Sequence, residues 1–342
     1  MNAGDDVARP PASAEEARAK YAPLPRTKRK GIGLCLSGGG FRAALFHLGA
    51  LRRLNELGLL TRNDFRTVSA VSGGAIAAAA LADALTHVVA TAGRPLPREA
   101  WDREVQGRLR AFTRKDARTA PLLKRLLPWN LWSADATVDA LAARFERGLT
   151  RLRLASVPSR PEFLFLATDL AYGVAWVFSR GWMGDYQAGY SAPPPELSLG
   201  RAVAASACFP PLFGPLRLRL DPSLLKGGSA ARGEERDRCV AGLRLTDGGA
   251  YDNMALEPVW KNHAVVLVSD AGGLFSGRGD RGLFPRMTRF LRVQERQARG
   301  LRKRWLIASF AQGVLDGAYW GVGSSPSQYD GGAIGYSKEL AR

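Results

Sequence analysis

Cysteine and histidine are both scarce in this chain. Its 342 residues include three cysteines, at positions 35, 208 and 239, and three histidines. An odd number of widely spaced cysteines argues against a disulfide scaffold, and none has the C-x-x-C or Cys/His spacing of a structural zinc site. The sequence therefore predicts a protein of a reducing compartment that holds no metal.

A secretory signal and a membrane-spanning segment are missing as well. Four acidic side chains lie within the first 16 residues, where a signal peptide would carry basic and then apolar ones. The least polar long stretch, residues 68–90, contains Asp83 and His87 and changes from a strand pattern to a helix pattern. A buried strand followed by a buried helix explains this stretch better than a membrane span. We therefore expect a cytoplasmic protein.

Acidic residues are scarce as well. The chain has 31 of them and 49 lysines and arginines, which gives a net charge of +18. The basic excess gathers at residues 103–125 and 281–304, and residues 126–132 carry two tryptophans beside the first cluster. Arginine beside tryptophan suits the surface of an anionic membrane, although a solvated basic face would leave the same pattern. Nucleic acid is not an expected partner, since no reading motif or aromatic stacking platform accompanies the charge.

What is present is the pattern of one α/β domain. Residues 1–30, rich in alanine, proline and charge, are typical of a mobile lead-in, and residues 31–342 are expected to form a single domain. Short apolar runs then alternate with helix formers over residues 32–36, 43–57, 67–71 and 75–85. Such a strand-helix-strand-helix start predicts a three-layer α/β/α fold with a mostly parallel central sheet.

The rest of the chain continues this alternation less regularly. A basic, mostly helical insertion over the functional site is expected at about residues 92–160. Residues 221–238 have the glycine and charge content of a flexible surface loop, and residues 335–342 resemble a helix start that stops. Further elements are expected as a helix at 199–207 and strands at 163–169, 174–178, 239–246 and 264–269.

A serine occupies the junction between the second predicted strand and the alanine-rich helix after it. In Ala70-Val71-Ser72-Gly73-Gly74 this serine has small neighbours, as a sharp turn requires and as in the G-x-S-x-G elbow of serine hydrolases. Ala70 replaces the first glycine of that pattern. Ser72 alone would fit a helix N-cap, but with the motifs below it is favoured as a nucleophile.

Three glycines follow the first predicted strand. The amides of Gly38, Gly39 and Gly40 lie at the start of a helix, where the dipole favours negative charge, so they suit an oxyanion hole. The segment also fits the dinucleotide fingerprint G-x-G-x-x-G/A, which requires an acid at the end of the second strand. Asp64 precedes that strand and Ser72 ends it, so the oxyanion hole is favoured. A P-loop is excluded because the Gly-Lys-Ser/Thr element is missing.

The best candidate for a general base is Asp247. It ends a predicted strand and is followed by Gly248 and Gly249, which let a substrate approach. A carboxylate there can take the serine proton directly, whereas the alternative is an Asp-Gly turn without chemistry.

The histidines test a triad against a dyad. His263 follows Ser72 and Asp247, so the order Ser, Asp, His of α/β-hydrolases is formally present. His263 directly precedes a predicted strand, however, which places it at the sheet edge opposite the serine. His47 and His87 fall within helix patterns and are expected to be structural.

In this order, the segments resemble the patatin-like phospholipases, lipid acyl hydrolases that use a Ser-Asp dyad. The resemblance covers residues 31 to about 275, and it includes Ala204–Phe213, which looks like the family's segment between nucleophile and acid. It implies a patatin-like fold, Ser72 as nucleophile, Asp247 as base and the glycine-loop amides as oxyanion donors. Arg42 would support the oxyanion loop, and the glycines expected to support the site are Gly74, Gly248 and Gly249.

The resemblance together with the basic surface gives the expected function. We expect hydrolysis of phospholipid or other lipid esters at an anionic membrane surface, by a peripherally associated enzyme that needs no cofactor. The alternative is a lipid-binding or regulatory protein whose hydrolase site is idle or is opened by an activating partner.

Overall fold

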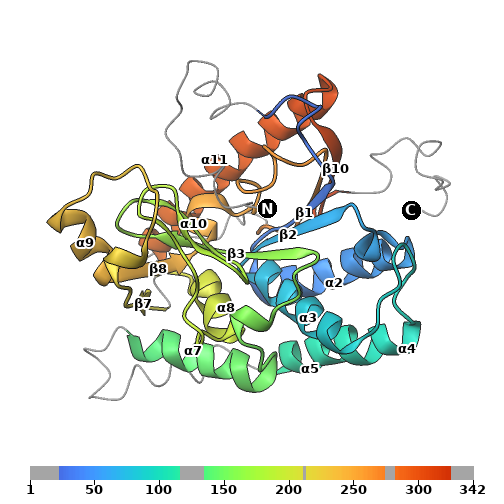
Figure 1. Cartoon of the computed structure of the whole chain (residues 1–342), viewed down its shortest axis with the longest axis horizontal. Coiled ribbons are helices and arrows are strands. Elements are labelled where there is room, and N and C mark those ends of the chain that lie inside the picture. Colours follow the sequence, from blue (N-terminus) through green and yellow to red (C-terminus); the bar gives the residue numbers. More distant parts are fainter. Residues whose placement is uncertain (1–22, 116–134, 211–212, 274–281, 325–342) are drawn as a thin grey trace.

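The computed structural model describes residues 23–115, 135–210, 213–273 and 282–324 (Figure 1). Within these ranges, ten strands form one sheet with helices on both faces. The predicted α/β class is therefore confirmed.

One half of the sheet is parallel, in the order β10-β9-β1-β2-β3. Helices α2 (Gly40–Glu56) and α3 (Gly73–His87) make the crossovers that parallel strands need. β1 lies at the centre and is buried at all five positions, as a strand covered on both faces must be. The strands of this half are β1 (Ile32–Leu36), β2 (Phe65–Val71), β3 (Glu162–Asp169), β9 (Val265–Asp270) and β10 (Asp316–Gly321).

The other half of the sheet is antiparallel. β3 continues into the meander β4-β5-β6, and β8 pairs with β3 and β7. Short turns join β3, β4, β5 and β6, and short turns allow only antiparallel neighbours. The sheet is therefore mixed, and the prediction of a mostly parallel sheet was wrong for this half. Its strands are β4 (Val174–Phe178), β5 (Met183–Asp185), β6 (Gly189–Ser191), β7 (Leu216–Leu218) and β8 (Leu243–Asp247).

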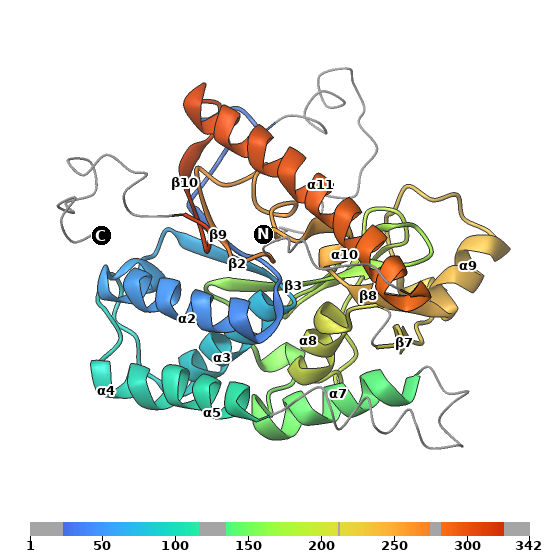
Figure 2. The ribbon, with the colours of Figure 1, turned by 180° about the vertical axis from the view of Figure 1, so that it is seen from behind.

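The two faces of the sheet belong to different layers. Leu34 and Leu36 of β1 pack into the large core under α2, α3 and α8 (Leu199–Ala207). Cys35 points the other way, into a small cluster with Trp260 and with Leu306 of α11 (Leu283–Ala311). Figure 2 shows the same arrangement, with α11 and the short α10 (Gly249–Asp252) on the side of the sheet opposite α2 and α3.

The helical insertion forms an outer layer on α2, α3 and α8 (Figure 1). Its apolar residues, among them Leu109 and Phe145, join the large core. The ring of Phe112 lies 5.6 Å from that of Phe41, next to the glycine loop. Residues 116–134, which also belong to the predicted insertion, lie outside the described residues. The described elements are α4 (Arg98–Ala100), a π-helical turn (Trp101–Gly107), α5 (Arg108–Arg114) and α7 (Asp135–Gly148).

Two predicted loose segments are ordered. Part of the lead-in is docked, because the amides of Leu24 and Lys30 donate to Lys261 O and Asn262 O at 3.1 and 3.0 Å. The supposed loop at 221–238 contains a turn of 3-10 helix (Pro222–Leu224) and the start of α9 (Glu234–Ala241). The buried guanidinium of Arg236 donates to backbone carbonyl oxygens and holds this segment in place. The charge pattern alone does not reveal this burial.

The boundaries of two further predictions change. The strand expected at 239–246 begins only at Leu243, since the residues before it finish α9. Residues 68–90 form the end of β2 and α3, and none of the helices in the described ranges is long and apolar enough to span a bilayer. The predicted helix start at 335–342 lies outside the described residues.

Candidate active site

Ser72 and Asp247 come together because two strands end against the same edge of β3. β2 runs parallel to β3 until Val71 pairs with Leu166. β8 approaches from the opposite direction and ends with Asp247 paired to Ala167. The carboxyl ends of the two strands therefore meet head to head, and residues 175 positions apart in the sequence become neighbours.

The backbone at Ser72 is strained. Its φ of 51° and ψ of −113° lie where residues other than glycine are rare. The side chain is buried and makes no capping hydrogen bond to any described residue, so the N-cap alternative is not supported. Gly74 allows this turn, since a Cβ atom there would lie 2.2 Å from Leu36 O in β1. The predicted elbow is thus present between β2 and α3.

A second serine holds the elbow in place. The Ser72 amide donates to Ser206 Oγ at 2.9 Å, and the Ser206 hydroxyl donates to Leu166 O at 2.6 Å. The amide of Gly248 donates to Ser206 O at 3.3 Å. Ser206, at the end of α8, therefore contacts the elbow, β3 and the acid motif together. Its place within the segment 204–213 was recognised from the sequence, but its contacts were not.

Asp247 is buried and held by hydrogen bonds. The Gly249 amide donates to Asp247 Oδ1 at 2.8 Å, and the Ser72 side chain is close enough to this carboxylate to affect its pKa. Burial raises the Asp247 pKa to about 7, against the lowering effects of the Gly249 amide and the Ser72 side chain. Gly248 is required by close packing, because a Cβ atom there would lie 2.2 Å from Leu166 O.

The glycine loop lies beside this pair. Gly39 and Gly40 have φ of 141° and 67°, conformations that favour glycine. A Cβ atom built on Gly38 would lie 3.3 Å from Ser72 Cβ, so the loop borders the serine. The Gly38 amide, however, donates to Asn253 O at 3.0 Å. Among the described residues no hydrogen-bond partner is found for the amides of Gly39 and Gly40.

Arg42 lies on the first turn of α2, and its side chain binds a backbone carbonyl group. Its guanidinium donates to Ala271 O at 3.2 Å, in the segment that follows β9. The same carbonyl oxygen would lie 2.7 Å from a Cβ atom on Gly39. Arg42 therefore ties the glycine loop to the segment that follows β9.

The histidines take structural positions. His47 is buried, with Nε2 2.9 Å from Ser37 O and Nδ1 2.9 Å from Ser269 Oγ. Burial lowers the His47 pKa to about 4, so the ring is neutral and supports the residue before the glycine loop. His263 contacts Thr67 Oγ1 at 2.8 Å, near the start of β2. It therefore lies at the opposite end of β2 from Ser72, as predicted, and a triad is not formed.

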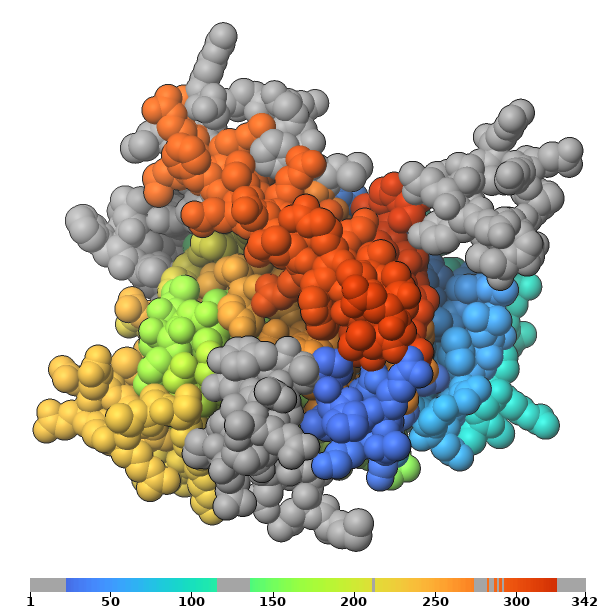
Figure 3. Space-filling view, turned by 90° about the horizontal axis from the view of Figure 1, so that it is seen from above, coloured from blue at the N-terminus to red at the C-terminus, as the bar shows by residue number. Residues whose placement is uncertain are grey.

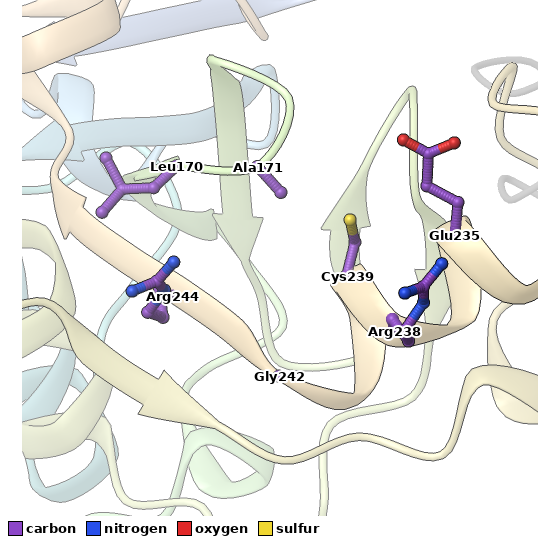
Figure 4. Close-up of a pocket in the computed structure, with 7 residues that line it drawn as sticks. All are labelled: Leu170, Ala171, Glu235, Arg238, Cys239, Gly242 and Arg244. Atoms are coloured by element: carbon purple, nitrogen blue, oxygen red, sulfur yellow. The ribbon is translucent and has the colours of Figure 1, made fainter.

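Other candidate sites lie apart from this pair. No cluster of three or more metal-ligating side chains occurs among the described residues. A cavity of about 400 Å³ lies between α9 and the turn after β3, lined by Arg238, Cys239 and Arg244 among others (Figure 4). Arg244 lies on the exposed side of β8, so this cavity is separate from the buried face that carries Asp247.

The sequence pattern of the patatin-like phospholipases matches residues 34–260, well over half of the chain. The chain belongs to the patatin-like phospholipase family. The match contains both Ser72 and Asp247. A search of curated proteins finds no significant match.

Two solved structures are similar to this chain at low sequence identity. Human GIVD cytosolic phospholipase A2 is 16% identical with a TM-score of 0.41, over 74% of this chain and 47% of that chain. VipD from Legionella pneumophila is 16% identical with a TM-score of 0.33, over 75% of this chain and 52% of that chain. The patatin-like chain therefore spans about half the length of these two proteins.

Proposed function

We propose that this patatin-like protein is a lipid acyl hydrolase with a Ser-Asp dyad. The observation that carries the proposal is the placement of Ser72, on a strained turn, beside the buried carboxylate of Asp247 where β2 and β8 end against β3. A nucleophile and a base within hydrogen-bond reach of each other form the minimal arrangement for covalent acyl transfer. Family membership supports an ester-linked lipid as the substrate.

The reaction would proceed in two balanced steps. Ser72 Oγ attacks the ester carbonyl carbon while its proton passes to Asp247, and the amides of Gly39 and Gly40 bind the oxyanion. Collapse of this intermediate breaks the ester bond, and Asp247 returns the proton to the leaving alcohol. Water then attacks the acyl-enzyme with Asp247 again as base, which releases the fatty acid and restores Ser72.

The raised pKa of Asp247 is suited to both halves of this cycle. A base whose pKa is about 7 is strong enough to accept the serine proton and weak enough to return it. Ester hydrolysis should therefore increase as the pH rises through about 7, because the carboxylate is the active form.

The proposed substrate is phospholipid at an anionic membrane surface. The net charge of +18 favours attraction to such a surface, and peripheral association follows from that attraction. Added salt should then reduce hydrolysis of vesicle lipid steeply and leave hydrolysis of a soluble ester unchanged. Equal salt sensitivity for both substrates would contradict the membrane part of the proposal.

Covalent labelling with a fluorophosphonate probe tests the dyad. The native chain should be labelled, Ser72→Ala should lose labelling, and Asp247→Asn should retain a small fraction. The matched controls are Ser156→Ala and Asp221→Asn, at exposed positions, which should label like the native chain. Labelling that survives in Ser72→Ala would refute the assignment of the nucleophile. A native chain that is never labelled would favour the idle or partner-opened alternative.

A further inference from the structure

Helix α11 packs with one face against the part of the molecule that carries Asp247 and α10. Leu306 is buried, and the ring of Trp305 lies 5.0 Å from that of Trp260. Arg302 Nε lies 3.8 Å from Asp252 Oδ1 in α10, the short helix that follows Asp247. α11 therefore lies directly beside the acid motif of the site.

One flank of the same helix, in line with the 39% exposed Trp305, carries an apolar stripe. Met287, Phe290 and Leu301 are 53%, 62% and 54% exposed. At 100° per residue these three positions fall within about 60° of the helix circumference. Figure 3 shows α11 crossing the surface of the molecule on this side. Three large exposed apolar side chains aligned along one flank form a candidate interaction surface, whereas the exposed Val293 and Ile307 lie outside the stripe.

The positive charge of α11 indicates what kind of partner this stripe would bind. α11 contains seven arginines and one lysine against a single acid, Glu295. Arg286 and Arg304 are exposed and lie along one border of the stripe. A second copy of this chain would bring the same cations against each other across a two-fold contact, which repulsion disfavours. A nucleic acid would be attracted by the arginines but would leave the apolar stripe in water.

An anionic lipid surface satisfies both features at once. Arginines bind lipid phosphates at the headgroup level, while methionine, phenylalanine and leucine enter the boundary of the acyl chains. We propose that α11 is the helix that docks this protein on anionic membranes, with the stripe of Met287, Phe290 and Leu301 inserted. This inference rests on the proposed lipid substrate. It places the acid motif next to the bilayer from which the substrate comes.

Vesicle flotation of the full chain tests this docking helix. Phosphatidylcholine vesicles are compared with vesicles of phosphatidylcholine and phosphatidylserine. Met287→Ser/Phe290→Ser should weaken binding to the anionic vesicles by about tenfold or more. The matched control Val89→Ser/Leu224→Ser, at apolar residues 90% and 63% exposed elsewhere, should bind like the native chain.

A second pair of variants tests the charged border. Arg286→Gln/Arg304→Gln should weaken binding to anionic vesicles by about fivefold for each arginine removed. Arg94→Gln/Arg232→Gln removes the same charge from exposed positions elsewhere and should have a much smaller effect. A similar loss in both pairs would show that total charge alone drives binding and would overturn the proposal.

The remaining outcomes keep this inference separate from the proposed chemistry. Ser72→Ala should float like the native chain, so a failure of the hydrolase assignment leaves the binding result readable. Thermal unfolding checks that the serine pair is folded, and the single variant Phe290→Ser serves if it is not. If the native chain does not bind vesicles but binds an oligonucleotide, docking on a membrane is refuted. Dimerisation through Phe290 would refute it as well.

Discussion

Helices α3 and α11 both border the proposed site, yet they differ in almost every physical respect. α3 follows Ser72 directly, is rich in alanine and is buried continuously from Gly73 to Ala84. α11 is nearly twice as long, and of its described side chains only Leu306 and Ser309 are buried. The first helix is part of the core, whereas the second is held to the core by a few contacts.

This difference separates two kinds of requirement. α3 must fix the nucleophile to within a fraction of an ångström, so close packing of small residues against β1 is what it needs. α11 presents its apolar and charged side chains outward, so its stability depends on fewer tertiary contacts. Substitutions should therefore be severe in and around α3 and mild on α11.

The largest expected effect on stability comes from the buried carboxylate of Asp247, beside the serine that precedes α3. The Asp247 pKa is raised from 3.8 to about 7, so the unfolded chain loses this proton at lower pH than the folded one. The native chain should then lose up to about 4 kcal/mol of unfolding free energy as the pH rises from about 4 to 7, and Asp247→Asn should not. Denaturant unfolding at several pH values measures this.

Asp221→Asn is the control for this pH dependence. Asp221 is exposed, and hydrogen bonds from Ser223 lower its pKa. Any stability that this carboxylate supplies is therefore present at neutral pH and is lost only when the pH falls below the ordinary pKa of an aspartate. An Asp247→Asn curve parallel to that of the native chain would show that burial does not perturb this carboxyl group.

The next effect is that of Gly74→Ala in α3. The added methyl group would meet Leu36 O at 2.2 Å, and backbone atoms of β1 cannot move aside without disturbing the sheet. We expect a loss of about 2–4 kcal/mol in unfolding free energy and weaker fluorophosphonate labelling. Gly49→Ala in α2, where nothing lies within 4 Å, is the control. Unchanged stability in Gly74→Ala would mean that α3 is not packed closely on β1.

The same contrast explains how much the sequence could reveal. β1 and α8 were predicted with their observed bounds, because apolar runs and helix formers there are local signals. The contact between Ser72 and Asp247 depends on strand register along β3, which no local pattern specifies. α9 was missed because its charged residues resemble a loop until the burial of Arg236 is known.

Ser206→Ala should have an intermediate effect at the boundary between core and site. It removes the acceptor of the Ser72 amide and the donor to Leu166 O, and it leaves both groups buried. The expected cost is about 1–3 kcal/mol in unfolding free energy. The labelling rate should fall as well, because the elbow loses its support. If stability falls while the labelling rate matches that of Ser156→Ala, Ser206 does not position the nucleophile.

The smallest expected effect lies in α11. Gly300 is in the middle of this helix, and a Cβ atom there would meet nothing within 4 Å. Gly300→Ala should stabilise the helix by about 0.5–1 kcal/mol through backbone entropy. Hydrogen exchange within α11 should slow accordingly. If α11 opens independently of the core, the unfolding midpoint of the whole chain will not move, whereas an equal gain in both measurements would show that α11 unfolds together with α3 and the sheet.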